Sequence, residues 1–404
     1  MYPPVGVSLH HAPTAKDAAM SSRIARRRVS ILGIRGIPAR HGGFETFAEG
    51  LALYLSRAGW EVTVYCQIEP GERVGVTVWE GIRLVHLAGN LPGALGTILF
   101  DLRSTWHACG HAGLVLTLGY NTAFLLFLLR LRGVANLINM DGLEWKRSKY
   151  GLAARTWLYL NERIACWLGD HLVADHPAIA DHLATRVRRN KITTIAYGAE
   201  AVPVADPRLL ADLGLASGAY ALVIARPEPE NSIREIVAAY SARRRGMPLV
   251  VLGRYETSQA YHRAVKAAAS DEVRFPGAIY DKAVVQALRR HCCIYIHGHQ
   301  VGGTNPSLIE ALGAGNPVLA HDNCFNRWVA GPEAAFFSQV EDCAAAFDRL
   351  LADDALRAAM GHASQARQAE LFRLDDRHED YRRLLAAWQP EGARGPISIL
   401  EGAQ

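Results

Sequence analysis

Lysine is scarce in this sequence of 404 residues, since six of its 44 cationic residues are lysine and the other 38 are arginine. An arginine bias suits the binding of anionic oxygens, but it also follows from GC-rich coding, to which we assign the larger share. The net charge of +5 is spread along the chain without long basic runs or interleaved aromatic residues. A nucleic-acid partner is therefore not indicated.

Paired cysteines and long apolar runs are also missing. The seven cysteines show no CxxC spacing, which argues against a zinc or thioredoxin-like site and predicts reduced, buried thiols. Residues 1–27 contain no continuous apolar segment, so we predict a flexible extension and neither a signal peptide nor an anchor. The uncharged stretch 112–129 is interrupted by GYNT at 119–122, which favours a strand, a turn and a helix over a membrane span.

From Val29 onward, short β-rich runs alternate with amphipathic helical patterns, which is typical of βα units and a mostly parallel sheet. The first helical pattern places Phe44, Phe47, Leu51 and Leu55 on one face, which we expect to pack on a sheet. Strands are expected at 29–36, 61–66, 74–79, 82–87, 114–119, 135–140, 171–175 and 191–198, and in a second series at 220–226, 248–253, 273–279, 292–299, 317–322 and 334–339.

These two series predict an α/β protein with two doubly wound, Rossmann-like domains. We place the first domain at 28–200, a linker rich in Ala, Pro and Gly at 201–218, and the second domain at 219–375. A C-terminal helix and tail occupy 376–404. Such sheets bind ligands at the carboxyl ends of their strands, so a central cleft between the domains is the expected site of a two-part ligand.

The first strand-to-helix turn, GIRGIPARHGGFET, forms a candidate loop for a phosphate or an acceptor. A helix N-terminus opens where glycines leave the backbone N–H groups accessible. The loop is not GxGxxG, so an NAD site is not supported. The alternative is a glycine-rich connection required only by chain geometry. The candidate residues are Arg35, Arg40, His41, Gly42 and Gly43.

Two segments of the second domain suit a diphosphate. Arg226 ends its first strand, where a guanidinium can bind phosphate by charge-assisted hydrogen bonds, although an ordinary surface ion pair is the alternative. In GHQVGGTNPSLIEALG, Asn305 is a good N-cap and is followed by proline at the first helical position. The helix dipole then points into the cleft behind Gly302 and Gly303, and Glu310 can accept hydrogen bonds from sugar hydroxyls.

These motifs resemble the retaining GT-B glycosyltransferases of sequence family four, from Val29 to about residue 388. GIRGIPARHGGFETF, MDGLEWKRSKY, VADHPAIADHL, ARPEPEN and GHQVGGTNPSLIEALG look like the branch of bacterial β-1,4-rhamnosyltransferases of cell-wall and capsular polysaccharide assembly. The resemblance implies donor binding by Gly302, Gly303, Thr304, Asn305 and Glu310, with Glu310 on the nucleotide ribose. Gly302 replaces the family's first glutamate, which fits a deoxysugar donor such as dTDP-rhamnose. Arg226 matches the family's diphosphate arginine, whereas Asn231 stands where lysine is usual.

Asp141 and Glu144 follow a predicted strand and are the catalytic candidates. Related enzymes carry a functional histidine or carboxylate in this region, and front-face attack assisted by the leaving phosphate requires no nucleophile. Asp141 would then orient the acceptor hydroxyl or stabilise positive charge. The alternative is that Asp141 only caps its turn beside Gly142. His297 and His299 share one face of a strand but lack a third ligand with suitable spacing, so we predict no metal site.

A basic, aromatic part of the first domain could contact an anionic bilayer and a lipid-linked acceptor, although packing of its aliphatic residues on the sheet is the alternative. Its residues are Lys146, Arg147, Lys149, Arg155, Trp157, Tyr159 and Trp167.

We therefore predict a cytoplasmic, metal-independent retaining glycosyltransferase, and contact with the inner face of the cytoplasmic membrane stays one of the two interpretations of its basic, aromatic part. No cofactor is expected beyond the nucleotide-sugar co-substrate, and the acceptor is a saccharide or lipid-linked saccharide. The alternatives are a sugar-nucleotide 2-epimerase of GT-B-like fold and a non-catalytic nucleotide-sugar binding protein.

Overall fold

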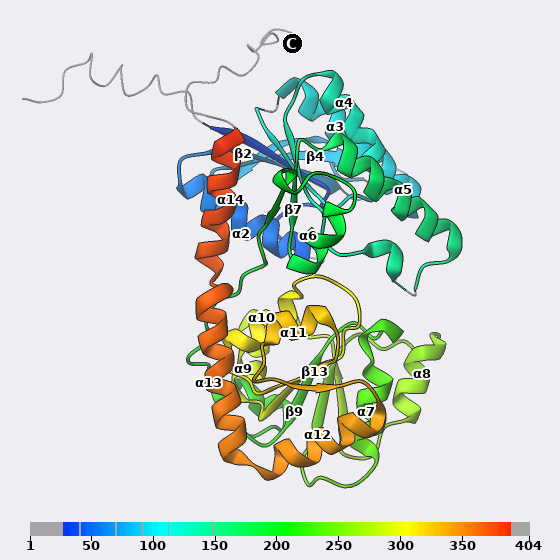
Figure 1. Ribbon diagram of the computed structural model, residues 1–404, viewed down its shortest axis with the longest axis vertical. Helices are drawn as coiled ribbons and strands as arrows, with labels where there is room; N and C mark the ends of the chain where they lie inside the picture. Colours follow the sequence, from blue (N-terminus) through cyan, green and yellow to red (C-terminus); the bar gives the residue numbers. More distant parts are fainter. Residues whose placement is uncertain are drawn as a thin grey trace, which may run out of the picture.

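The computed structural model describes residues 27–39, 42–68, 71–89, 91, 93–111, 113–147 and 149–388. The predicted extension up to residue 26, the predicted tail from residue 389, and the loop candidates Arg40 and His41 lie outside the described residues. The described chain forms two α/β units, one above the other in Figure 1.

The first unit is an eight-stranded sheet in the order β3-β4-β2-β1-β5-β6-β7-β8. Its pairs are parallel except that β3 runs antiparallel to β4 at the edge. The strands are β1 (Arg28–Leu32), β2 (Glu61–Ile68), β3 (Gly75–Trp79), β4 (Ile82–Ala88), β5 (Val115–Leu118), β6 (Asn136–Asn139), β7 (His171–Ala174) and β8 (Ile192–Thr194). The helices are α2 (Gly43–Arg57), α3 (Gly93–His111), η1 (Ala123–Leu126), α4 (Phe127–Leu131), η2 (Glu144–Lys146), α5 (Leu152–Leu168), α6 (Pro177–Ala184) and η3 (Arg189–Lys191).

The second unit is a six-stranded parallel sheet in the order β11-β10-β9-β12-β13-β14. The strands are β9 (Ala221–Ile224), β10 (Leu249–Leu252), β11 (Val273–Gly277), β12 (Ile294–His297), β13 (Val318–His321) and β14 (Ala335–Phe337). The helices are η4 (Pro207–Leu213), η5 (Pro229–Asn231), α7 (Ile233–Ser241), α8 (Ala260–Ala267), α9 (Lys282–His291), α10 (Pro306–Gly313), α11 (Cys324–Ala330), α12 (Val340–Ala352), α13 (Asp354–Leu371) and α14 (Leu374–Trp388).

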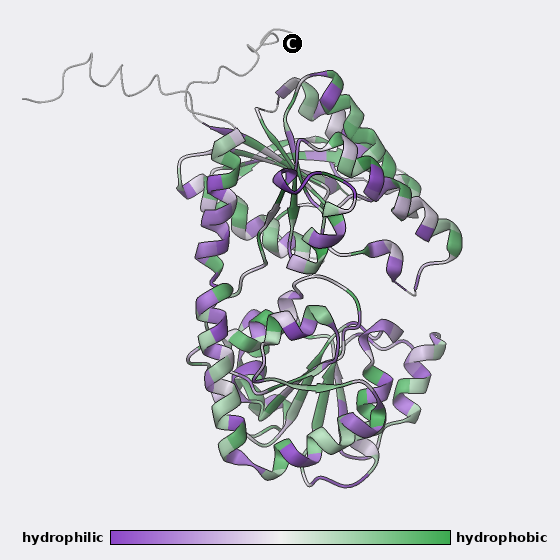
Figure 2. Cartoon of the chain, in the orientation of Figure 1, coloured by the Kyte–Doolittle hydropathy of each residue, from purple (hydrophilic) through white to green (hydrophobic). Residues whose placement is uncertain are grey.

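The central strands are apolar because helices cover both faces of each sheet. All four residues of β5 and of β10 are buried, and Figure 2 shows apolar strands between helices with polar outer faces. The predicted stripe of α2 is confirmed, since Phe47, Leu51 and Leu55 are buried. The α/β class with two doubly wound sheets is confirmed as well.

Two segments differ from the sequence prediction. The helix expected after the GYNT turn at 119–122 begins as the 3-10 helix η1 and continues as the short α-helix α4. Within the described residues, none of the helices has the length and apolar character that a bilayer span requires. The strand expected at 191–198 contains only residues 192–194, because the chain then leaves the sheet toward the second unit.

Helix α14 returns to the first unit after α13 has run along the second (Figure 1). Asn139 Nδ2 at the end of β6 donates a hydrogen bond of 2.8 Å to the hydroxyl oxygen of Tyr381. The Tyr54 hydroxyl on α2 donates to Glu379 Oε2 at 3.0 Å. These contacts attach the last described helix to the first sheet.

Candidate active site between the two sheets

A cavity of about 230 Å³ lies where the carboxyl ends of β1, β5 and β6 face the end of β9. Gly33 and Gly119 have φ angles of 86° and 83°, and a Cβ at Gly33 would lie 2.1 Å from the carbonyl oxygen of Leu118. Glycine is therefore required for β1 and β5 to meet at the cavity wall. The lining residues are Gly33, Phe44, Leu118, Gly119, Tyr120, Asn121, Asp141, Glu144, Arg147, Lys149, Tyr150 and Arg226.

Asp141 follows β6 and adopts a left-handed backbone with φ of 48°. Its N–H donates to Asn139 Oδ1 at 2.9 Å, which stabilises the turn. Burial and the nearby Asp175 carboxylate raise the pKa of Asp141 to about 6, although Arg147 acts in the opposite direction. Asp141 is half-buried where it lines the cavity, and the carboxylate of Asp175 is the like charge beside it.

Glu144 begins η2 and is placed by Tyr120. The Tyr120 hydroxyl accepts a hydrogen bond from the Glu144 N–H at 2.9 Å and donates to the Gly142 carbonyl at 3.1 Å. Burial and Asp141 raise the pKa of Glu144 to about 7, opposed by Arg147, whose Nε lies 2.8 Å from Glu144 Oε1. The two catalytic candidates therefore share one turn and one cavity.

Arg147 and Lys149 connect this turn to the second unit. Arg147 Nη1 lies 3.2 Å from Oε1 of the buried Glu230, and Lys149 Nζ lies 3.3 Å from Glu228 Oε2. These pairs are not apparent from the sequence pattern. The sequence feature that could have indicated these pairs is the complementary charge of two segments, the cationic run after Asp141 and the acidic PEPEN segment after Arg226.

Asp175 is a further residue of the site that no sequence motif singled out. It directly follows β7, is buried, and accepts a hydrogen bond of 2.6 Å from the Thr304 N–H. Its backbone carbonyl accepts another hydrogen bond from the Thr304 hydroxyl. A Cβ at Gly303 would lie 2.1 Å from both carboxylate oxygens of Asp175. A Cβ at Gly142 would lie 3.2 Å from Gly302 Cα. The glycine loop of the second unit thus packs directly on the first.

Two of the predicted donor residues of the second unit, Arg226 and Asn231, differ in exposure. Arg226 has a side chain that is 71% exposed, lies 3.8 Å from Glu228 Oε1, and faces the cavity. Asn231 is buried, and its Nδ2 donates to the Arg226 carbonyl at 2.8 Å. The amide of Asn231 therefore orients the backbone of Arg226.

Helix α10 starts as predicted, because Asn305 is its N-cap and accepts from the Ser307 N–H at 3.1 Å, with Pro306 next. Glu310 lies farther along this helix and forms an ion pair with Arg289 of α9, which is buried. Glu310 remains 42% exposed and is not among the residues that line the cavity.

The N-termini of α2 and α10 approach each other across the two units. A Cβ at Gly43 would lie 3.6 Å from Pro306 Cγ, and Gly42 and Gly43 are exposed. Arg35 is exposed too, and its backbone N–H donates to Glu45 Oε1 at 3.4 Å. Two helix N-termini directed at one space favour an anion there.

His297 and His299 stack with ring centroids 4.3 Å apart. Burial lowers the pKa of both rings, so they are neutral near pH 7. Among the described residues, no group of three or more His, Cys, Asp or Glu side chains could hold a metal ion.

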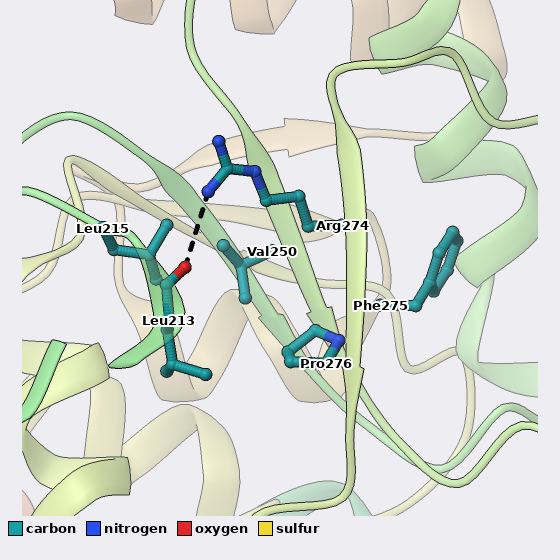
Figure 3. A pocket seen from close by; sticks show the side chains of 6 residues that line it. All are labelled: Leu213, Leu215, Val250, Arg274, Phe275 and Pro276. Atoms are coloured by element: carbon teal, nitrogen blue, oxygen red, sulfur yellow. Dashed lines mark hydrogen bonds between the residues drawn. The ribbon is translucent and has the colours of Figure 1, made fainter. Parts of the chain in front are cut away.

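A second hollow, of about 180 Å³, lies at the edge of the second sheet (Figure 3). Its one charged side chain is Arg274, whose Nη1 donates to the carbonyls of Leu213 and Gly214 at 3.5 and 3.1 Å. The other lining residues are Leu213, Leu215, Val250, Phe275 and Pro276. This hollow lacks acid-base groups and is separate from the cavity described above.

Two family models match the chain. The model described as Glycosyl transferase 4-like domain matches residues 42–198, and that described as Glycosyl transferases group 1 matches residues 213–367. The two matches cover the first sheet except β1, the second sheet, and the cavity residues except Gly33. No curated protein sequence gives a significant match.

Several solved structures share the whole fold. Sucrose-phosphate synthase from Thermosynechococcus elongatus is 20% identical, with a TM-score of 0.74 over 90% of this chain and 100% of that one. HepE from Anabaena in complex with UDP and glucose is 13% identical, with a TM-score of 0.73 and the same coverage. An alpha,alpha-trehalose-phosphate synthase (UDP-forming) from Burkholderia vietnamiensis is 12% identical, with a TM-score of 0.66 over 90% and 100%. At these identities the likeness establishes the arrangement of the two sheets.

Proposed function

We propose that this chain, a glycosyltransferase of the GT-B type, transfers a sugar from a nucleotide-activated donor with retention of configuration. Its first domain matches the glycosyl transferase 4-like model, and its second domain matches the glycosyl transferases group 1 model. The acceptor is a saccharide or a lipid-linked saccharide. The observation that carries the proposal is one cavity lined by Asp141 and Glu144 of the first domain and Arg226 of the second.

The donor diphosphate has two sources of stabilisation. The exposed guanidinium of Arg226 can donate charge-assisted hydrogen bonds, and the positive end of the α10 dipole lies behind Gly302 and Gly303, although the Ser307 N–H is already bonded to Asn305. The partly exposed Glu310 carboxylate would accept hydrogen bonds from the nucleotide ribose. The acceptor would enter from the first-domain side, beside Asp141.

The chemical step requires stabilisation of positive charge on the sugar and orientation of an acceptor hydroxyl. An ionised Asp141 supplies both, and it need not form a covalent intermediate because the leaving phosphate can assist the attack. No metal is required, since Arg226 and the helix dipoles can neutralise the diphosphate.

For the donor sugar we propose L-rhamnose from dTDP-rhamnose. Gly302 provides no carboxylate at the position where the resembled family grips a hexose hydroxyl, and a 6-deoxysugar needs one hydrogen-bond partner fewer. UDP-glucose is the competing donor, because UDP and glucose are bound in the HepE structure.

The test is incubation of the purified chain with dTDP-rhamnose or UDP-glucose, in EDTA, with and without a saccharide acceptor. We expect nucleotide release from dTDP-rhamnose chiefly when acceptor is present, and an NMR coupling pattern of the product that retains the donor's anomeric configuration. A changed nucleotide sugar without acceptor would indicate the 2-epimerase, and binding without turnover would indicate a non-catalytic protein. Activity lost in EDTA and restored by Mg²⁺ or Mn²⁺ would refute the metal-free reaction.

A further inference from the structure

Exposed apolar residues are concentrated on one side of the first domain. Of the 16 large apolar side chains that are exposed in the described part of the chain, ten lie between residues 91 and 167. They are Leu91, Leu95, Leu102, Trp106, Phe127, Leu131, Leu152, Trp157, Leu160 and Trp167. Leu91 precedes α3, and the other nine lie on the outer surfaces of α3, α4 and α5, which we call the α3–α5 face.

The three helices of this face form one continuous layer. Helix α3 packs against α4 and η1, and η1 packs against α5. They lie together on the outer side of the upper domain in Figure 1, and Figure 2 shows apolar residues along them. Contiguous apolar surface of this kind marks a binding surface.

Helix α3 is apolar on both of its sides. Its inner side places Phe100 and Cys109 in the core. On its outer side Leu95, Leu102 and Trp106 recur at i, i+7 and i+11, and their exposed fractions are 65%, 39% and 61%. Packing on the sheet therefore accounts for the inner stripe only.

The charge on this face has one sign. Arg132 lies over the Trp106 ring and Arg130 over the Trp167 ring, each at 5.5 Å from the centroid. The carboxylates of the same helices point inward, because Asp101 accepts from the Thr122 hydroxyl at 2.7 Å and the buried Glu162 accepts from Trp145 Nε1 at 2.7 Å. Three further exposed arginines belong to α3 and α5, namely Arg103, Arg155 and Arg163.

We propose that the α3–α5 face docks on an anionic phospholipid bilayer. Tryptophan side chains are suited to the boundary between headgroups and acyl chains, and neighbouring arginines can contact lipid phosphates. A second copy of the chain fits less well. In a two-fold dimer the same residues would meet their own copies, which would place arginines against arginines without a facing carboxylate.

The docked face adjoins the cavity. Trp157 Nε1 donates a hydrogen bond of 2.9 Å to the carbonyl of Asn121, and Asn121 lines the cavity. Leu152, which is 82% exposed, follows the cavity residue Tyr150 by two positions. A lipid-linked acceptor in the bilayer could thus reach Asp141 without leaving the membrane. This last step rests on the proposed function, whereas docking itself does not.

Co-sedimentation of the full chain with vesicles tests docking without any activity measurement. The vesicles contain phosphatidylcholine with phosphatidylglycerol, or phosphatidylcholine alone. We expect binding to the anionic vesicles that weakens with added salt. Two double variants test the face, Trp106→Ser/Trp167→Ser and Arg130→Glu/Arg132→Glu. Each should reduce the partition coefficient of the protein onto anionic vesicles at least about tenfold. All four side chains are on the exposed surface, so circular dichroism should be unchanged.

Matched controls come from the second domain. Arg244→Glu/Arg254→Glu makes the same change of charge at side chains that are 81% and 80% exposed, and Tyr280→Ser removes an aromatic ring that is 85% exposed. Both controls should bind vesicles like the wild type. Absence of wild-type binding, or equal binding by the α3–α5 variants and the wild type, would overturn the proposal. A concentration-dependent dimer that the tryptophan variants abolish, without vesicle binding, would overturn it in favour of self-association.

Discussion

The carboxylate of Asp175 occupies the space that a side chain on residue 303 would need. Asp175 Oδ2 accepts the Thr304 N–H at 2.6 Å, and the position of a Cβ on Gly303 is 2.1 Å from that carboxylate. The glycine loop before α10 is therefore shaped by a residue of the other domain. Its requirement for glycine is steric, because the φ angle of Gly303 is not in the left-handed region.

Gly303→Ala should separate the two domains locally and weaken donor binding. The added methyl group must displace either the Asp175 carboxylate or the loop, and overpacking of this kind costs ~1–3 kcal/mol of folding free energy. We expect a lower Tm and a higher KM for the donor. Gly110→Ala is the control, since Gly110 is on the exposed side of α3 with no atom within 4 Å of its Cβ position. Identical Tm and KM for both variants would contradict the steric account.

Arg226→Ala should weaken donor binding while the fold is retained. A charged hydrogen bond to the diphosphate contributes about 1.5–3 kcal/mol, so Kd for the nucleotide should rise by roughly 10- to 100-fold. Calorimetric titration with the nucleoside diphosphate measures this. Arg254→Ala removes an arginine of similar exposure from the same domain and should leave Kd unchanged. Wild-type affinity in Arg226→Ala would remove Arg226 from the donor site.

Asp141→Asn should lower kcat by roughly 100-fold or more, as loss of a general base or an electrostatic group commonly does. Donor affinity should change little. Asparagine tolerates the left-handed backbone at this position and keeps the size of aspartate, so a residue that only shapes the turn would accept the exchange. Near-normal kcat in the folded variant would shift attention to Glu144.

The same variant should change the dependence of stability on pH. Burial raises the pKa of Asp141, Glu144 and Asp175 to about 6, 7 and 6, and a neighbouring carboxylate adds to the rise at Asp141 and Glu144. The folded chain therefore holds these protons more tightly than the unfolded chain, and its free energy of unfolding falls as pH rises from about 4 to about 7. The Asp141→Asn substitution removes one of the three carboxyl groups whose pKa is raised.

We expect Asp141→Asn to be more stable than the wild type by on the order of 2 kcal/mol at about pH 8, with the difference vanishing below about pH 4. Urea unfolding at a series of pH values measures it. Asp212→Asn, on the exposed surface, should follow the wild-type curve. A constant offset at every pH would show that Asp141 has no raised pKa. A variant that is less active but more stable would mark a site that sacrifices stability for function.

The sequence predicted the parts of the site that depend on where strands end. Arg226 and Asp141 each follow a β-strand, and the carboxyl ends of parallel strands meet at one edge of a sheet, so their convergence on one cavity could be expected. The pairs Arg147–Glu230, Asp175–Thr304 and Arg289–Glu310 could not. Each depends on side chains from two elements whose relative position follows from packing, which hydrophobic periodicity does not determine.

The role of Asn231 illustrates the same limit. Asn231 stands where the resembled family usually has lysine, and the structure buries it and directs its amide to the Arg226 carbonyl, a contact that the motif does not indicate. Element types were easier to predict than element bounds. The strand expected at 191–198, for example, has only residues 192–194 in β8.

Helix α14 has a consequence for how the chain is made. Its Tyr381 and Leu385 belong to the same apolar cluster as Leu51 of α2, and the Tyr54–Glu379 pair beside them joins residues 325 positions apart. During translation one side of the first domain's core therefore stays uncovered until the entire second domain has left the ribosome. Domains usually fold in the order of their synthesis. Here the domain that is synthesised first is the one that is completed last.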